Sequence, residues 1–376
     1  MKTKISKIAA FCLAAVMSLG VATGCNGGTS SSESSSSASS DKESSSASES
    51  SSAAESTDSS SSAADTTELT KLKLQVTWLP QGEFMGYYVA QAKGYYAEEG
   101  IDVEIIPGSS DISSPDQVEN GVADLGVCFY TNLLTYQEGG YDVVNVAQFY
   151  QKTPLWMISK KEKGIESAAD FKGKRIGNWF GGQQFELYAL CSKYGLDIDT
   201  DVTWVQQDFT MDAFYEDELD VASVFNFNEY HLVLEAGYSP DDLNVININD
   251  EGIAMLQGCL FADRQWAADN KDLLVRFIRA SVKGWKDACA DPEGAGQIVW
   301  DAGQSVSLEH QITMCQEVAS LVCPDGYDPA LIGNIDLDKV QNTIDLGLQY
   351  NLISTAIDPA TSVDNSYWEE ATKDLS

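Results

Sequence analysis

Apolar and polar side chains alternate in short segments from residue 72 onward, and this pattern predicts strands and helices in turn. Leu72–Thr77 has the two-residue period of a half-buried strand. Pro80 has no N–H for strand pairing, and a helical pattern then covers Phe84–Gly100. Ligands bind at the carboxyl ends of strands in open α/β sheets. The aromatic turn that carries Trp78 is therefore a candidate binding wall.

The alternation continues in two blocks, and the second begins near Leu155. Repeated βα units with short connections predict an α/β fold, with a mostly parallel sheet and helices on both faces. Two blocks of similar size predict two lobes. The pattern becomes helical after Trp266, with helices expected at 270–289, 291–302, 308–323 and 337–350.

The first 70 residues lack this alternation. Residues 1–24 begin with basic side chains and continue with an apolar stretch that is too short to span a bilayer. This arrangement is typical of a secretory signal peptide. Val21–Cys25 is similar to a bacterial lipobox, with Ala22 where Leu is usual, and predicts a lipid on Cys25. An ordinary signal peptide with a chance cysteine is the alternative. The Ser-rich composition of the following residues predicts a disordered tether over 25–70.

Charge and cysteine content narrow the classes of partner and cofactor. A formal net charge of −34 disfavours nucleic acid and anionic lipid surfaces, because their binders need a basic face. No cysteine forms a CxxC pair or lies near a His at metal-ligand spacing, so we do not expect a zinc site. No other metal and no cofactor are predicted. Cys315 and Cys323 could form a disulfide, but a chain of this length can bury a core without one. Free thiols are the favoured interpretation.

Several motifs stand in the order and spacing of a known family: Trp78-x-Pro80, Gly86-Tyr87-Tyr88-Val89-Ala90, Gly121-Val122-Ala123-Asp124, Leu219-Asp220-Val221-Ala222 and Phe227-Asn228-Glu229-Tyr230. From about Lys71 to about Ala290 the chain resembles the SsuA/THI5-like (NMT1-type) substrate-binding proteins of ABC importers. The resemblance implies a two-lobed type II periplasmic-binding fold. Its hinge of two crossings would lie near Pro154 and Gly258–Phe261. The lobes would be 71–154 with 262–376, and 155–261.

The resemblance also bears on the ligand. The family binds thiamine-precursor pyrimidines, riboflavin, and small sulfonates, nitrate or bicarbonate. Its pyrimidine binders and the related pyrimidine synthases often carry His at the position of Phe84, and the cysteine-rich motif of the synthases is also missing here. We therefore expect a binding protein rather than an enzyme, and a monomer that works with ABC permease subunits. A thiamine-pyrimidine synthase-like enzyme and a nitrate, sulfonate or taurine binder remain as alternatives.

An aromatic heterocycle needs stacking surfaces and a few polar groups. We expect these from residues that follow the strands of both lobes: Trp78, Phe84, Tyr87, Phe129, Tyr130, Trp179, Gly181, Gly182, Glu186, Asn226 and Glu229. The two glycines would offer backbone N–H groups at a helix N-terminus. The alternatives are packing roles for the aromatic residues, complementarity to the helix dipole for Glu186, and helix capping by Asn228.

The turns at these strand ends carry aromatic, Asn, Gln and Glu residues, whereas oxyanion sites use Arg, Lys, Ser or Thr. This favours a neutral or cationic nitrogen heterocycle. A nucleophile elbow, a phosphate-binding loop and an HExxH motif are all missing from the sequence, so no catalytic residue is predicted. The prediction is a lipid-anchored receptor on the extracytoplasmic face of a bacterial membrane. It would capture a vitamin-related heterocycle, either a thiamine pyrimidine precursor or a riboflavin-like molecule.

Overall fold

The computed structural model describes residues 68–180, 182–208 and 210–375. The predicted signal peptide, the lipid site Cys25 and the tether as far as residue 67 lie outside the described residues, as does Gly181. Among the helices that are described, none combines the length and the apolar character needed to cross a membrane.

The first lobe is built on a five-stranded sheet in the order β2-β1-β3-β10-β4. Its strands are β1 (Thr70–Gln75), β2 (Ile101–Ile106), β3 (Leu125–Cys128), β4 (Val143–Gln148) and β10 (Cys259–Asp263). β1 runs parallel to both β2 and β3, with Leu72 opposite Val103. Leu72 and Leu74 are fully buried, as the period of this segment predicts.

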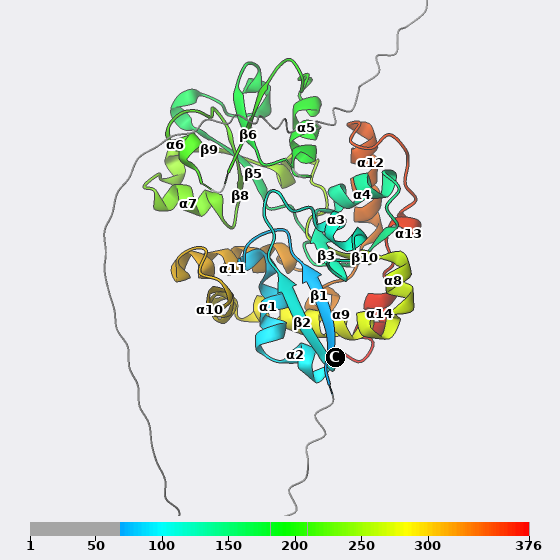
Figure 1. Cartoon of the computed structure of the whole chain (residues 1–376). Helices are drawn as coiled ribbons and strands as arrows, with labels where there is room; N and C mark the ends of the chain where they lie inside the picture. The colour runs from blue at the N-terminus through cyan, green and yellow to red at the C-terminus, as the bar shows by residue number, and fades with distance from the viewer. Residues whose placement is uncertain (1–67, 181, 209, 376) are drawn as a thin grey trace, which may run out of the picture. The chain divides into compact units, whose positions relative to one another are not determined.

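The second lobe contains two smaller sheets, which Figure 1 shows as a separate green group. They comprise β8-β5-β9 and β6-β7, with bounds β5 (Leu155–Lys160), β6 (Arg175–Asn178), β7 (Thr203–Gln206), β8 (Ala222–Phe225) and β9 (Leu243–Asn247). The predicted mostly parallel sheet is wrong, since β5 and β10 run antiparallel to both of their neighbours. These are the strands that enter their sheets directly after the chain has crossed from the other lobe.

The helices cover these sheets. The α-helices are α1 (Met85–Ala92), α2 (Tyr95–Glu98), α3 (Ser114–Glu119), α4 (Tyr130–Glu138), α5 (Gln184–Lys193), α6 (Asp212–Tyr215), α7 (Glu229–Glu235), α8 (Arg264–Asp269), α9 (Lys271–Ala290), α10 (Pro292–Ala302), α11 (Leu308–Val322), α12 (Leu337–Gln349), α13 (Pro359–Ser362) and α14 (Ser366–Thr372). Short 3₁₀ helices are η1 (Gly82–Phe84), η2 (Lys161–Lys163), η3 (Ala168–Phe171), η4 (Pro240–Asp242), η5 (Ile248–Glu251) and η6 (Pro329–Leu331).

The single helix predicted over Phe84–Gly100 is divided, because Gly94 takes a left-handed φ of 77° between α1 and α2. The long helices after residue 266 match the predicted ranges within one or two residues. α9 packs against α1, and a Cβ atom on Gly284 would lie 2.2 Å from the carbonyl oxygen of Gly86. Both α9 and α10 thus pack on α1 of the first lobe.

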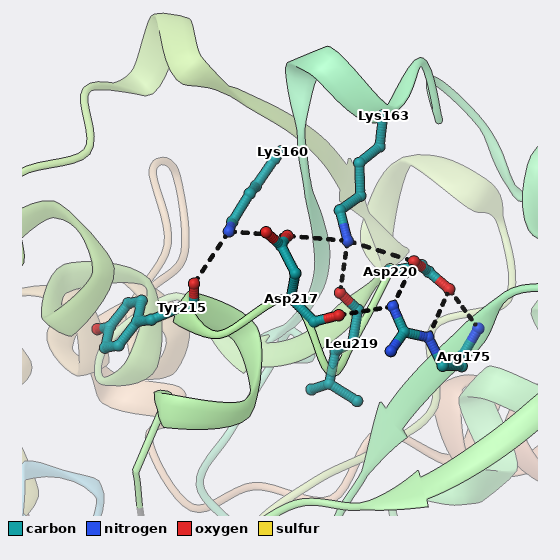
Figure 2. Close-up of polar contacts among 7 residues, drawn as sticks. All are labelled: Lys160, Lys163, Arg175, Tyr215, Asp217, Leu219 and Asp220. Carbon is teal, nitrogen blue, oxygen red and sulfur yellow. Dashed lines mark hydrogen bonds and ion pairs between the residues drawn. The ribbon is translucent and has the colours of Figure 1, made fainter.

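An ion-pair cluster ties the strands of the second lobe together (Figure 2). The Asp220 carboxylate, just before β8, accepts hydrogen bonds from Nε and Nη2 of Arg175 on β6 at 3.1 and 2.9 Å. Lys163 contacts both Asp217 and Asp220, at 3.1 and 3.2 Å. The Arg175 hydrogen bonds hold the pKa of Asp220 well below its usual range. The cluster therefore links β6 by charge to the segment that leads into β8, next to the isolated bridge between Ile176 and Val221.

Cysteine side chains add no covalent link among the described residues. The described cysteines are free thiols, which include both Cys315 and Cys323. The closest approach that the structure gives is a 3.8 Å contact between the Sγ atoms of Cys128 and Cys259 on adjacent strands. Packing therefore holds the described residues together without disulfides.

Candidate functional site

A cavity of about 650 Å³ lies between segments of the two lobes. The first lobe contributes the turn after β1, the loop at 109–115 and the end of β3, and the second lobe contributes the ends of β6 and β8 and the start of α7. This volume is in the range of small-molecule sites. The strand ends of both lobes therefore line a cavity at the place where the sequence predicts a site.

Aromatic rings form much of the cavity wall. The Phe129 ring at the end of β3 lies 6.4 Å, between centroids, from the Phe225 ring at the end of β8, so the lobes meet at this pair. Trp179 lies 5.4 Å from Phe225, and its indole Nε1 donates to the backbone oxygen of Asp208 at 3.2 Å. Trp78, half-buried, also lines the cavity. Such walls can stack on a planar ligand.

Next to Trp179, the backbone of Phe180 is strained. Its φ of 63° lies in the left-handed region that non-glycine residues rarely adopt, and its N–H is held by the Asn178 side chain at 2.8 Å. Non-glycine residues in this conformation cost about 1–3 kcal/mol and tend to cluster at ligand sites. Phe180 lines the cavity, so the strained turn belongs to the site.

The charged residues of the cavity wall are all acidic. Glu83, Asp111, Asp208 and Glu229 line it, and its described lining includes no Lys, Arg or His. Oxyanion sites need positive charge or an array of N–H donors. The described wall therefore suits a cation or a neutral ligand rich in N–H donors better than nitrate or a sulfonate.

Glu229 opens α7 and is held by the protein itself. Its Oε2 accepts the backbone N–H of Phe225 at 2.9 Å, and its Oε1 accepts Nδ2 of Asn228 at 2.7 Å. Burial raises the pKa of Glu229 to about 7. Burial, and then repulsion from Glu229, raises the pKa of Glu83 to about 8. Groups with such shifted pKa values are typical of functional sites.

Four of the predicted residues line this cavity: Trp78, Phe129, Trp179 and Glu229. Phe84 and Tyr87 instead border a small pocket of about 20 Å³ beside it. The Tyr87 ring packs edge-on against Phe149 and Trp285. Its location is thus that of a core side chain.

Tyr130 is also a core residue, fully buried, and its hydroxyl pairs with Ser362 Oγ at 2.6 Å. Tyr130 is the first residue of α4 and lies on the buried face of that helix. The preceding residue, Phe129, lines the cavity. Asn226 is held by Glu317, to which its Nδ2 donates at 3.1 Å, and it does not line the cavity. These two side chains therefore have structural partners within the protein.

Gly182 does not present the free N–H that the sequence suggested. Its N–H donates to Oε1 of Gln184 at 2.8 Å, and its oxygen accepts the Thr131 hydroxyl at 3.4 Å. Its φ is 114°, and a Cβ atom here would lie 3.0 Å from Cβ of Asn132 in the first lobe. Glycine at this position allows the lobes to approach closely.

Glu186 lies away from the cavity, next to the two segments that join the lobes. Its Oε2 accepts the Thr153 hydroxyl at 2.8 Å and Nε2 of Gln257 at 3.0 Å, and its Oε1 accepts the Met255 N–H at 2.7 Å. Thr153 precedes β5, while Met255 and Gln257 precede β10. Burial raises the pKa of Glu186 to about 8, although these three hydrogen bonds favour the carboxylate. Glu186 therefore ties both lobe connections to α5.

The sequence did not point to several cavity residues: Glu83, Gln183, Phe225 and the 109–115 loop. Asn228, for which it offered helix capping or ligand contact, lines the cavity and makes no capping hydrogen bond with its side chain. Gln183 is 8% exposed, and its Oε1 has no hydrogen-bond partner among the described residues. Asn228 is positioned by His310 of α11, whose Nε2 lies 2.9 Å from its Oδ1. Glu83 and Gln183 could have been found from their positions, because each lies within one of the two aromatic turns that the sequence analysis identifies.

Comparison with known proteins agrees with this fold. A riboflavin-binding protein, RibY, of Chloroflexus aurantiacus is 31% identical over 240 residues, which are 60% of this chain and 65% of that protein. A 4-amino-5-hydroxymethyl-2-methylpyrimidine phosphate synthase of Schizosaccharomyces pombe is 25% identical over 233 residues, 59% of this chain and 66% of the enzyme. The chain thus spans just under two thirds of the length of each relative.

The solved structure of the alkanesulfonate-binding protein SsuA from Xanthomonas axonopodis pv. citri, bound to MOPS, superposes with a TM-score of 0.60. It is 16% identical, and the match covers 79% of this chain and 99% of that structure. The fold is therefore that of the two-lobed periplasmic binding proteins. Residues 81–295 match the sequence profile described as NMT1/THI5 like. With that match over more than half of its length, the chain belongs to the NMT1/THI5-like family.

Proposed function

We propose that this protein is the extracytoplasmic solute-binding component of an ABC importer and that its ligand is a vitamin-related nitrogen heterocycle. The observation that carries the proposal is the cavity between the lobes, with its aromatic wall and its acidic charged groups. A thiamine pyrimidine precursor or a riboflavin-like molecule offers a planar ring and N–H donors to such a wall.

The proposed mechanism is closure of the lobes around the ligand. A ligand that contacts Phe129 in one lobe and Trp179 in the other interacts with both only when the lobes are close, so it favours the closed state by its differential affinity. The closed complex would then deliver the ligand to the permease subunits. Lipidation of Cys25 and the Ser-rich segment would keep a monomeric receptor at the membrane surface.

Isothermal titration calorimetry tests the ligand class. The probes are 4-amino-5-hydroxymethyl-2-methylpyrimidine, thiamine, riboflavin, taurine and nitrate. We expect saturable binding of at least one heterocycle and none of the two oxyanions. Binding of taurine or nitrate alone would overturn the proposed ligand class, because the described cavity wall carries no basic side chain.

Membership of a family that includes pyrimidine synthases makes catalysis the rival function. Phe84 stands where the synthases often carry His, so we propose binding without turnover. Incubation with pyridoxal phosphate discriminates the two. A Schiff-base absorption band with release of a pyrimidine would establish the enzyme, whereas an unchanged spectrum beside heterocycle binding supports the receptor.

A further inference from the structure

Glu83 and Glu229 reach the same cavity from opposite lobes. Glu83 lies in η1, directly after the aromatic turn that follows β1, and Glu229 is the first residue of α7 after β8. Both side chains line that cavity, and repulsion by Glu229 adds to the effect of burial in raising the pKa of Glu83. Two such groups destabilise the approach of the lobes unless a proton or a cation lies between them.

Two acceptor groups at this cavity have no hydrogen-bond donor among the described residues. No described residue donates a hydrogen bond to the Glu83 carboxyl group. Oε1 of Gln183 is buried without a partner, although Gln183 lines the same cavity. A buried acceptor that lacks a donor, such as Gln183 Oε1, destabilises a structure by about 1–3 kcal/mol, and a ligand that brings N–H groups would supply the missing donor.

We propose that Glu83 and Glu229 form a carboxylate clamp, one side from each lobe, for a planar cationic nitrogen group of the ligand, with Gln183 accepting a further N–H. An amidinium-type edge, such as that of a protonated aminopyrimidine, matches this arrangement because it is flat, positively charged and carries several N–H donors. This inference rests on the proposed receptor function and specifies the chemistry of the ligand edge.

The clamp also explains how the ligand would drive closure. When both groups are ionised and no cation is bound, the two carboxylates oppose the approach of the lobes. A cation between them replaces the repulsion by two attractions, which act together only in the closed state. The ligand charge would therefore set the balance between open and closed forms.

Other titratable groups adjoin the pair. Tyr88 and Tyr150 lie near Glu83, and burial, with the charge of Glu83 adding to it, raises the pKa of each well above its usual range. They therefore stay neutral near pH 8. Asp111 and Asp208 add negative charge along the cavity wall, and His310 contacts Asn228 behind Glu229. A test must cancel the contributions of these groups.

Benzamidine and benzamide provide that test, because they have the same shape and differ in charge. The ratio of the benzamidine affinity to the benzamide affinity cancels any effect of neighbouring groups that changes both affinities equally. In the unaltered chain we expect benzamidine to bind at least about tenfold more tightly than benzamide near pH 8.5. Benzamidine stays cationic, so its affinity should rise between about pH 6 and pH 9 as the two glutamates ionise, while that of benzamide should stay level.

Three variants locate the effect. Glu83→Gln and Glu229→Gln should each lower the benzamidine-to-benzamide ratio by about fivefold or more. Glu104→Gln, an exposed residue of β2 outside the cavity, makes the same change in net charge and should leave the ratio within about twofold. Glu83→Gln breaks no described hydrogen bond, so its folding should be intact even if Glu229→Gln unfolds.

The outcomes separate the clamp from the proposed function. An equal ratio in the unaltered chain and the two cavity variants overturns the clamp, even where riboflavin or the pyrimidine binds. A ratio that depends on both glutamates, together with no binding of any vitamin-related heterocycle, establishes the clamp and overturns the proposed ligand class.

Discussion

Oε2 of Glu186 on α5 accepts a hydrogen bond from the Thr153 hydroxyl at 2.8 Å and another from Nε2 of Gln257 at 3.0 Å. Thr153 and Gln257 lie in the two separate segments through which the chain passes between the lobes. One buried side chain of the second lobe therefore fixes both connections relative to each other. It is a structural element of the region about which lobe closure would occur.

Glu186→Ala should lower the free energy of unfolding by about 2–4 kcal/mol, because it leaves three buried donors without an acceptor. Urea denaturation followed by tryptophan fluorescence measures this change. Glu166→Ala is the control, since Glu166 is exposed in the same lobe and its side chain makes no described contact. Equal midpoints for the two variants would contradict a stabilising role for Glu186.

Asp220→Asn should destabilise the second lobe by about 1–3 kcal/mol, since it weakens the charge-assisted bonds to Arg175 and Lys163. The folded pKa of Asp220 is depressed, so its contribution is present above the unfolded value of about 3.9 and is lost as the pH falls further. Thermal unfolding at neutral and acid pH should show a gap between the variant and the unaltered chain that closes on acidification. A gap that persists in acid would refute the ionic origin.

Glu83 predicts the opposite dependence on pH. Its folded pKa of about 8 lies above the unfolded value of about 4.3, so the folded state holds a proton that the unfolded state releases. Stability of the unaltered chain should therefore fall as the pH rises from about 4.5 to about 8. Glu83→Gln removes this contribution, and the variant should gain stability relative to the unaltered chain over that interval.

Chemical denaturation at a series of pH values checks the Glu83 prediction. Glu104→Gln serves as the matched variant, because it alters an exposed glutamate. If the plots of unfolding free energy against pH run parallel for the unaltered chain and Glu83→Gln, Glu83 does not have the raised pKa.

Cys25→Ala tests the predicted lipid anchor. Expressed in a bacterium, the unaltered chain should sediment with membranes, and the variant should be released from them, because the cysteine thiol is the attachment point of the lipid. Cys323→Ala, at a half-buried free thiol, is the control for loss of a cysteine as such. Membrane association of Cys25→Ala would contradict the lipobox interpretation.

Local patterns predicted local structure well. The bounds of α9 and α11 follow from helical period and from caps such as Ser307, which are encoded within the segments themselves. The direction of β5 and β10 depends on where the chain re-enters each sheet, and no local period encodes that. The lobe limits at residues 154 and 261 stay predictions.

The candidate site was predictable in position more than in composition. Phe129 and Tyr130 are adjacent aromatic residues, yet only Phe129 lines the cavity, because the start of α4 turns Tyr130 into the core. Glu83 and Glu229 are 146 positions apart, so their electrostatic interaction exists only in the folded chain. From the sequence, Glu186 is an acidic residue in the first turn of α5. Its role in holding the lobe connections depends on partners that are far away in the sequence.

The position of β10 has a consequence for the order of folding during synthesis. β10 begins at Cys259 and fills the gap between β3 and β4, which ends at Gln148. A ribosome must therefore complete the entire second lobe before the first sheet can close, and until then β3 and β4 have unpaired edges. Such edges bind chaperones or aggregate. The second lobe, whose sheets use only residues 155–247, can form first.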